Sequence, residues 1–518
     1  MTSSQQFLAE YGNPVLGNPG HYSALAYLQN GNQLYCCRVM SGALYGGLSI
    51  SYSAGTNAPM PVGEATNNFV YTSGQDSLFQ IYGANPGSWN NNLAIAIIKS
   101  TTIDPTLNAN AFDIIVYQLI NGTYTQVEEW TVSRQTQLNG NGQQQYLETV
   151  INGFSQYISV ADSSVISTTM PNVNVSPGSV ATVQINGQSV YLFALQNGND
   201  GTNLITQYNS GSDAAIFING WSLFTNPADV DVRILINAGF PQTDPVISTY
   251  IALSVAQARK DCIAILDMDP AQTASTSAMI NWVTNTLNLN TTYAAIYAPM
   301  VKDYDSFNAS LVYLPGSGYI ASQFAYNDNV ANVWYAPAGL NRGVLNVLGI
   351  CNQDGIRTVF AQGDRDALYA VAINPLQVFP GSGNVIWGQK TLTPQPSALD
   401  RVNVRRLLIV IEKVMAVSLQ SFVFEPNNQF TRFRITAMLE TFLDTLSSAG
   451  AFQTELGDKG YLVVCNDTNN TPAIIDDNEL VVNVFVKPSK AAEFIQLNVI
   501  VTSTGASFQE LIAQGTLL

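Results

Sequence analysis

The chain contains a single histidine, His21, and this limits the catalytic chemistry that it can support. A Ser-His-Asp triad needs an imidazole to accept the proton of the nucleophile, so a hydrolase of that type would have to use His21. The residue follows Gly20 near the start of the chain, and no Gly-x-Ser-x-Gly sequence places a nucleophilic serine at a sharp turn. The sequence therefore predicts a protein that is not an enzyme of this class.

Two acidic residues, Asp267 and Asp269, follow an apolar run that predicts a strand over residues 262–267. Carboxylates at the end of such a strand can ligate Mg²⁺. The Asp-x-Asp-Pro sequence is also an ordinary turn, and no phosphate-binding loop, further carboxylate group or zinc-spaced Cys/His set accompanies it. We favour the turn and predict no catalytic residue, no metal site and no cofactor.

Composition indicates a folded, acidic, multidomain protein. Of the 518 residues 46% are hydrophobic and 11% are charged, and the net charge is −16. Such a charge argues against nucleic acid as a partner, because phosphate binding needs clustered Lys and Arg. No apolar run is long enough to cross a bilayer and no leader opens the chain, so we predict a soluble, unsecreted protein without membrane insertion. Five cysteines without a Cys-x-x-Cys pair suit reduced thiols: Cys36, Cys37, Cys262, Cys351 and Cys465.

Residues 400–502 contain the clearest signals for where helices and strands begin and end. Asp400 precedes apolar residues at helical spacing and is predicted to cap a helix, and Asn427 or Asn428 is predicted to cap a second helix after Pro426. Gly450 supplies the stop, because glycine tolerates the left-handed backbone that commonly ends a helix. Strands are then predicted over 461–465, 480–487 and 494–502.

Basic residues concentrate near the starts of these two helices, in an otherwise acidic chain. They are Arg401, Arg405, Arg406, Arg432 and Arg434. One interpretation is ion pairing within the domain, to Glu412, Glu425 or Glu440, since such pairs are common and individually weak. The alternative is contact with an acidic surface on a partner.

The last predicted strand is suited to joining copies of the chain. A strand near a chain end, rich in β-branched residues, can add its backbone groups to the sheet of another copy. The residues predicted to make this pairing are Phe494, Ile495, Leu497, Val499 and Val501. The alternative is that these strands pair only within their own domain.

Upstream, periodicity divides the chain further. A helix around 22–29 and a strand over 33–39 are predicted first. Residues 46–225 show short alternating runs between turns, at 93–98, 112–119, 127–132 and 190–195, which predicts a β-rich insertion with one helix over 143–157. From residue 229 strands and helices alternate, with helices near 248–259 and 275–287, which indicates a largely parallel sheet.

Several sequence blocks resemble the contractile phage tail sheath family, in the family's order. They are GSWNNNLAIAI, LPGSGYIASQFAYND, VWYAPAG, VIWGQKTL, NVRRLLIVIEKV, FEPNNQFT, CNDTNNTP and VFVKPSKAAEFIQLNVIVT. The resemblance implies an α+β multidomain fold with a central α/β core of subtilisin-like type, an α/β C-terminal domain and a β-rich insertion. The family carries an N-terminal arm ahead of the pattern around Tyr11. This sequence begins close to that pattern, so either the arm has been removed or the subunits are linked differently.

The resemblance also implies a domain plan and a function. The expected parts are 1–45, the start of the core; 46–225, an outward-projecting β-rich region; 226–399, the central domain; and 400–518, a domain that faces a tail tube and links subunits. Arg401, Arg405 and Arg406 would then face the tube. The expected function is a sheath subunit, made in the host cytoplasm, that polymerises helically around the tube in the virion and contracts. Its expected partners are other copies, the tube, the baseplate and the tail terminator.

Three alternatives stay open at this stage. A sheath of a bacterial contractile injection system would share the residue-level arguments. An α/β hydrolase with a β-rich accessory domain is disfavoured by the single histidine. A carbohydrate-binding surface protein would use the Asn- and Tyr-rich insertion.

Overall fold

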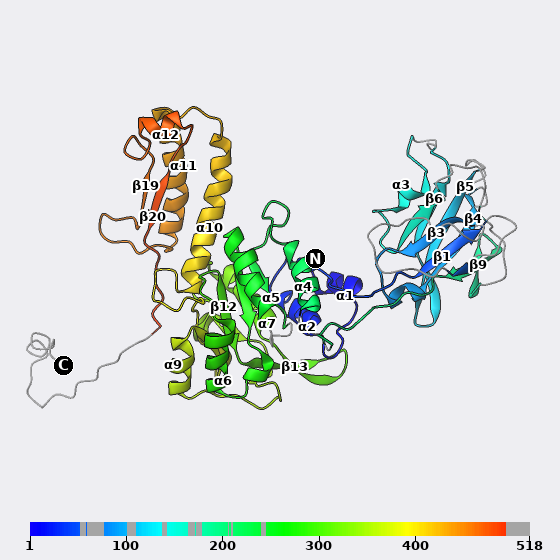
Figure 1. Ribbon diagram of the computed structural model, residues 1–518, viewed down its shortest axis with the longest axis horizontal. Helices are drawn as coiled ribbons and strands as arrows, with labels where there is room; N and C mark the ends of the chain where they lie inside the picture. The colour runs from blue at the N-terminus through cyan, green and yellow to red at the C-terminus, as the bar shows by residue number, and fades with distance from the viewer. Residues whose placement is uncertain are drawn as a thin grey trace, which may run out of the picture. The chain divides into compact units, whose positions relative to one another are not determined.

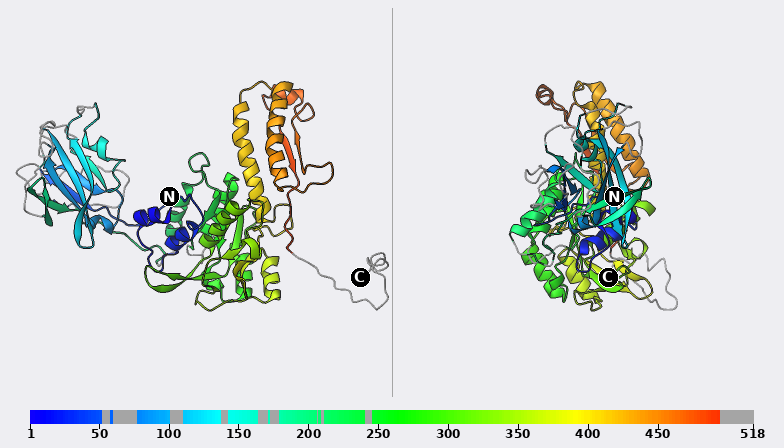
Figure 2. Two further views of the ribbon diagram at one scale, coloured as in Figure 1. Left: turned by 180° about the vertical axis from the view of Figure 1, so that it is seen from behind. Right: turned by 90° about the vertical axis from the view of Figure 1, so that its right-hand side faces the viewer.

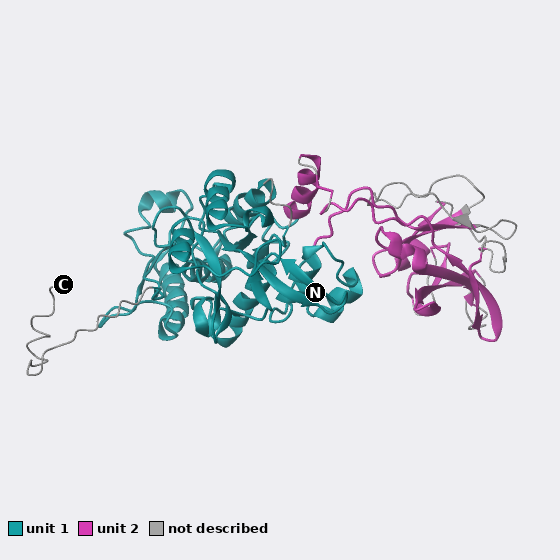
Figure 3. Ribbon diagram, turned by 90° about the horizontal axis from the view of Figure 1, so that it is seen from below, with its two compact units in different colours: residues 1–35, 223–518 teal, residues 36–222 magenta. Residues whose placement is uncertain are grey.

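The computed structural model describes residues 1–51, 58–59, 77–100, 110–136, 142–163, 171, 179–205, 207–208, 211–239 and 245–493. The chain divides into two compact units, with residues 1–35 and 223–518 in unit 1 and residues 36–222 in unit 2 (Figure 3). Helices and sheets occur together, which confirms the α+β class. The finer division into four parts stays a prediction.

Unit 2 contains two antiparallel sheets. The first has the order β2-β1-β3-β7, with β1 Gly47–Ser51, β2 Ala58–Pro59, β3 Ser77–Gly83 and β7 Ile158–Asp162. The second has the order β6-β5-β4-β9-β8, with β4 Leu93–Lys99, β5 Ala111–Ile120, β6 Thr123–Ser133, β8 Ala181–Ile185 and β9 Gln188–Ala194. A shared hydrophobic cluster includes Ile50, Phe79, Ile95, Phe112 and Val160, so the two sheets pack face to face.

A buried ion pair also joins these two sheets. Arg134, just after β6, lies 2.7 Å from Asp162 at the end of β7, and both side chains are almost fully buried. The guanidinium also donates to the hydroxyl of Ser163. An unpaired charge in a protein interior is strongly destabilising, so removing either residue would leave the other as a destabilising buried charge.

The predicted strands of unit 2 are confirmed as β4, β5, β6 and β9. The predicted helix over 143–157 is much shorter and consists of α3, Leu147–Ile151. It ends there because Asn152 bonds the backbone of Val160 through both its amide atoms and Gly153 adopts φ +82°. The unit also holds the short η1, Ser88–Asn92, and α4, Ser212–Ser222.

Unit 1 is built on a six-stranded sheet with the order β10-β11-β12-β17-β18-β15. Its strands are β10 Ile234–Ile236, β11 Ile263–Asp267, β12 Ala294–Ala298, β15 Val344–Leu345, β17 Ile373–Phe379 and β18 Gly383–Ile386. Strands β10, β11, β12 and β17 pair in parallel, which confirms the predicted strand-helix alternation, and β18 and β15 add as antiparallel edge strands.

Helices cover both faces of this sheet (Figures 1 and 2). On one face α7, Ser317–Val330, packs Ile320 and Phe324 in a cluster with Ile265 and Tyr297. α2, Pro19–Tyr27, joins that cluster, and α1, Ser4–Tyr11, contacts α2. The π-helix η3, Tyr250–Gln257, also contacts β11 and continues α5, Val246–Thr249. The remaining helices are η4 Pro270–Gln272, α6 Thr276–Asn281, which continues as the π-helix η5 Trp282–Leu287, α8 Gly339–Arg342 and α9 Gln362–Ala370.

A small antiparallel sheet follows β12. It has the order β14-β13-β16, with β13 Met300–Asp305, β14 Ser310–Leu314 and β16 Gly349–Cys351. Val301, Val312 and Leu314 point into the main hydrophobic cluster, so one face of this sheet is buried and the other is outward.

A long helical hairpin ends the described chain. α10, Val402–Leu419, and η6, Gln420–Phe422, lead to α11, Gln429–Ser448, and these pack with β19 Tyr461–Val464, α12 Pro472–Asp476 and β20 Asn483–Val486 (Figure 1). Asn428 caps α11 by accepting from the amide of Thr431, and Gly450 follows it at φ +83°, both as predicted. The predicted cap by Asp400 is wrong, because Arg401 is the N-cap and the Asp400 carboxylate pairs with that arginine instead.

The predicted strand over 33–39 is also wrong. The segment is extended but lies in no sheet of the described chain, because no neighbouring strand pairs with it. Its contacts are isolated, such as the amide of Leu34 donating to the carbonyl oxygen of Met1. An alternating sequence permits a strand, but a strand also needs a partner for its backbone groups.

Asp267 ends β11 and holds the start of α7. Its carboxylate accepts from the amide of Ser317 at 2.8 Å, the hydroxyl of Ser317 at 2.6 Å and the amide of Gly239 at 3.0 Å. Burial raises the pKa of Asp267 to about 6, against the opposing effect of these hydrogen bonds. The residue therefore joins the carboxyl end of a central strand to the first turn of a helix.

This pKa predicts a pH effect on stability. The folded chain holds the proton of Asp267 more tightly than the unfolded chain does, so the free energy of unfolding should rise as the pH falls through 6. Between pH 7.5 and pH 5 the gain should be about 1 kcal/mol, since one pH unit corresponds to roughly 1.4 kcal/mol. Urea unfolding of the wild type and of Asp267→Asn at both pH values measures it. Equal pH dependence in the two proteins would contradict this assignment.

Candidate functional site

The residues first considered for catalysis are held by structural contacts. His21 lies on α2, where Nε2 is 3.1 Å from the carbonyl oxygen of Tyr11 and the ring packs edge-on against Phe7. Within the described part of the chain it bonds to no serine or carboxylate. Asp269 accepts from the amide of Ala271 and caps the short η4, which is the predicted turn.

Nowhere in the described ranges do three or more His, Cys, Asp or Glu side chains gather as a metal site would require. Nor does any described helix combine the length and apolarity needed to span a bilayer. The five cysteines are free thiols, and Cys262, Cys351 and Cys465 are buried.

The arginines of α10 are engaged inside unit 1. Arg405 is 4% exposed, donates to Thr292 and Tyr293, and lies 4.2 Å from the centre of the Tyr293 ring. Burial lowers the pKa of this guanidinium. Arg406 is 6% exposed, pairs with Asp328 and stacks on Phe324 of α7.

Arg401 is more accessible but is also paired. Its guanidinium contacts Asp400 at 2.9 Å and Glu493 at 2.7 Å. No ion pair of the described chain uses Glu412, Glu425 or Glu440, so the expected partners were wrong although internal pairing occurs. Contact between these arginines and a partner stays a prediction. For Arg405 and Arg406 it would require the guanidinium groups to leave their buried sites.

The feature best suited to binding is the sheet of β19 and β20. One face packs on the helical hairpin, where Val463 is buried and Val484 and Val486 are partly buried. The opposite face exposes Leu462 and Phe485, which lie directly across from each other and are 57% and 58% exposed. A two-stranded sheet is marginal by itself, so this sheet depends on the helices behind it.

One edge of β20 presents backbone groups to the outside. The amide of Lys487 donates to the carbonyl oxygen of Gly460, which makes these two residues a hydrogen-bonded pair. Along an antiparallel ladder, opposite residues alternate between hydrogen-bonded and non-hydrogen-bonded pairs. Phe485 then bonds Leu462 across the ladder, and the backbone groups of Val484 and Val486 point away from β19. In the described chain no strand pairs with that edge.

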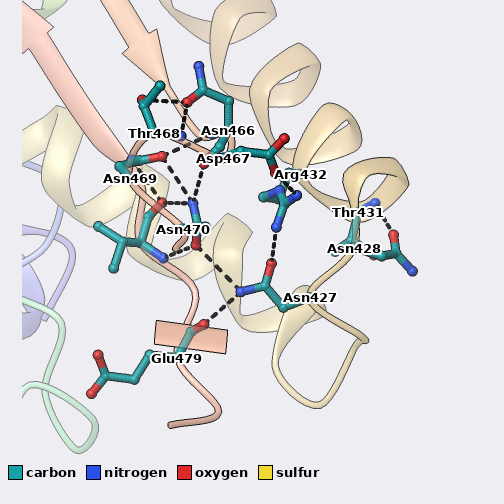
Figure 4. A network of polar contacts seen from close by, with 11 residues as sticks. Asn427, Asn428, Thr431, Arg432, Asn466, Asp467, Thr468, Asn469, Asn470 and Glu479 are labelled. Carbon is teal, nitrogen blue, oxygen red and sulfur yellow. Dashed lines mark hydrogen bonds and ion pairs between the residues drawn. The ribbon is translucent and has the colours of Figure 1, made fainter. Parts of the chain in front are cut away.

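A network of side-chain amides fixes the approach to β20 (Figure 4). Asn470 is 1% exposed, and its Nδ2 donates to the carbonyl oxygen of Val481 while its Oδ1 accepts from the amide of Val481. Asn469 donates to the carbonyl oxygens of Val464 and Val481, so it joins the end of β19 to the residue two before β20.

The same network reaches the start of α11. Asn427 donates to the carbonyl oxygen of Glu479 and lies 3.5 Å from Asn470, and Arg432 donates to Asn427 and Asp467 (Figure 4). The connection between β19 and β20 is therefore held at a fixed position on the helical hairpin. This fixes which backbone groups of β20 face outward.

Sequence reasoning treated residues 466–470 only as a polar loop and missed this role. The available signal was three asparagines in five residues next to a strand end. An asparagine side chain both donates and accepts, so it can bond a backbone amide and carbonyl as a neighbouring strand would. The predicted pairing residues Phe494, Ile495, Leu497, Val499 and Val501 lie outside the described residues.

Comparison with known proteins gives matches along much of the chain. Residues 214–392 match the phage tail sheath protein central domain and residues 394–502 the phage tail sheath C-terminal domain. The chain is 34% identical over 351 residues to the tail sheath protein of Enterobacteria phage T4 and 32% identical over 353 residues to that of Vibrio phage KVP40. Each match covers 63% of this chain and 51% of the relative, so the chain spans about half the length of these relatives.

A solved structure shares the fold. The sheath tail protein of Listeria innocua aligns with a TM-score of 0.53 at 11% identity, over 90% of this chain and 84% of that protein.

The network predicts a specific effect of Asn470→Ala. The backbone amide of Val481 loses its acceptor, and the carbonyl oxygen of Val481 loses one of its donors. A buried group left without a hydrogen-bond partner costs about 1–3 kcal/mol. Amide hydrogen exchange over residues 481–486 should therefore quicken markedly. Thr468→Ala is the control, because Thr468 is exposed in the same loop and bonds only within it. Equal exchange in the two variants would contradict the role of Asn470.

Proposed function

Because the chain belongs to the phage tail sheath protein family, we propose that it is a structural subunit of a contractile tail sheath. Copies polymerise helically around a tail tube, and contraction of the polymer drives the tube through the envelope of the host cell. The subunit resides in the virion tail after synthesis in the host cytoplasm. Its partners are other copies, the tube, the baseplate and the tail terminator.

The open edge of β20 is the observation that carries this proposal. A strand from another copy that pairs with it would satisfy the outward groups of Val484 and Val486. The exposed Leu462 and Phe485 lie on the same small sheet and would be covered by the added strand or by side chains around it. We assign the donated strand to the segment that contains Phe494, Ile495, Leu497, Val499 and Val501, as the sequence predicts.

The role is structural rather than catalytic. Energy for contraction is stored in the packing of the assembled subunits, which rearrange between two states, and no nucleotide or metal is needed. We retain the prediction that Arg401 faces the tube, since its side chain is the most accessible of the three arginines. A sheath of a bacterial contractile injection system would use the same contacts, and genome context distinguishes the two.

We also carry forward two finer architectural proposals. The central sheet, with parallel strands between layers of helices, is of the subtilisin-like type. The chain consists of four parts, 1–45, 46–225, 226–399 and 400–518. Limited proteolysis followed by mass spectrometry would locate the boundaries, and cleavage confined to positions well inside these parts would contradict the division.

Val484→Pro tests the strand edge. Proline removes the outward amide of Val484 but no hydrogen bond of the β19–β20 ladder, and proline is tolerated at an open strand edge. We expect a folded monomer and a rise of at least tenfold in the concentration needed for polymers. Sedimentation and electron microscopy measure assembly, and thermal unfolding measures folding.

Phe485→Pro is the matched control one residue away. It removes the amide that bonds Leu462, so it should destabilise the fold itself, by about 1–3 kcal/mol, because proline deletes a hydrogen bond of the ladder and leaves its partner unsatisfied. Polymers of Val484→Pro that form at the wild-type concentration would exclude the edge from assembly.

A further inference from the structure

A second surface of exposed apolar side chains lies at the turn between α10 and α11. Val423, Phe424, Phe430 and Phe433 form this surface, which we call the hairpin tip. Phe430 and Phe433 are each 69% exposed, and because they are three residues apart they share one side of α11. Clustered exposed aromatic residues of this kind mark a binding surface, whereas single exposed apolar residues are normal.

Phe424 makes the case more specific. Its side chain is fully exposed and its backbone has φ +71°, in the left-handed region that a bulky residue rarely adopts. Among the described residues, nothing packs on this side chain that would compensate for the strain. Strain and exposure at one residue together indicate that Phe424 is held ready for contact with another molecule.

A complementary surface lies on the outer side of the β13–β14 hairpin. Tyr304 faces Leu311 across the two strands and Lys302 faces Tyr313, and these four residues form what we call the β13–β14 face. Tyr304 is 54% and Leu311 46% exposed. The ammonium of Lys302 lies 5.8 Å from the centre of the Tyr313 ring.

The acidic residues of the same strand are turned the other way. Asp303 accepts from the hydroxyl of Tyr319 and Asp305 from the hydroxyl of Tyr22, both on the inner side. The β13–β14 face is therefore apolar with one positive charge. The hairpin tip is apolar with the exposed Glu425 beside Phe424, while its nearby cation, Arg434, stacks on Phe422 and Phe430.

The two surfaces lie at opposite ends of unit 1, so they cannot cover each other within one chain (Figures 1 and 2). We propose that the hairpin tip of one copy docks on the β13–β14 face of the next copy, with Glu425 placed against Lys302. Contacts between two different surfaces of identical copies build rings where the rotation between copies closes and helical polymers where it does not, so such a contact suits a helical sheath. This inference rests on the proposed function and names a contact within it.

Phe424→Gly is the sharpest single test. Glycine suits φ +71° and removes the exposed ring, so the thermal midpoint should stay within a few degrees of the wild type or rise. The concentration needed for polymers should rise at least tenfold. Tyr304→Ser, on the opposite surface, should give the same loss of assembly with the fold retained, as checked by circular dichroism.

A charge exchange tests the identity of the occupant. Glu425→Lys and Lys302→Glu should each impair assembly of the full chain. An equimolar mixture of the two should assemble again, because each tip then meets a face of opposite charge, and the double variant should assemble by itself. Restoration in both cases requires that the two residues meet between copies.

The remaining outcomes are distinguishable. Wild-type-like assembly of Phe424→Gly overturns the docking, and so does normal assembly of Tyr304→Ser when Phe424→Gly fails. Unimpaired self-assembly of Phe424→Gly with lost binding to purified tail tube assigns the tip to the tube and overturns the proposal. A wild type that forms no polymer at any concentration, with or without tube, overturns the proposed function and this contact together.

Discussion

The backbone hydrogen bonds of β20 are the constraint on which the C-terminal part of the structure depends. Peptide groups need partners, and a two-stranded sheet leaves half of those in each strand unpaired by its neighbour. On one side β19 supplies the ladder, and at the beginning of β20 Asn469 and Asn470 act in place of a further strand. The backbone amides and carbonyls of Val484 and Val486 have no partner strand in the described chain. Side chains outside the sheet hold them in one register.

The N-terminal half of α10 connects this sheet to the rest of unit 1. Val402 and Ile409 belong to the central hydrophobic cluster, while Leu407 and Ile411, on the same helix, belong to the cluster of the helical hairpin. Arg405 and Arg406 add polar contacts to Thr292 and Asp328 of the central part. One helix therefore contributes to both hydrophobic cores and joins the β19–β20 sheet to the part of unit 1 that holds the six-stranded sheet.

Sequence reasoning succeeded where a local rule decides the outcome. Asn428 and Gly450 bound α11 because capping and left-handed termination depend on one or two residues, and the parallel strands followed from alternation along the chain. It failed where the partner is distant in sequence. Arg406 pairs with Asp328, 78 residues earlier, and residues 33–39 alternate like a strand but find no neighbour.

The candidate site divides in the same way. That β20 exists was predictable from its β-branched residues, although its bounds are narrower than 480–487. Which of its edges is open depends on the bond between Lys487 and Gly460 and on the asparagine network, and no periodicity in the sequence encodes either. The hairpin tip was missed because a helical pattern treats Phe430 as part of the apolar face, whereas the helix turns that residue outward.

The two proposed contacts differ in a way that suits a polymer with two states. A backbone ladder bonds peptide groups that every residue has, so it tolerates rotation about the chain segments that lead to it while keeping its hydrogen bonds. A contact of exposed aromatic rings on an apolar face is non-directional, because it needs no fixed hydrogen-bond geometry. It can therefore be broken in one arrangement of the subunits and formed in another. In the proposed sheath the edge of β20 therefore keeps copies connected throughout, and the hairpin tip is the contact whose change distinguishes one state from the other.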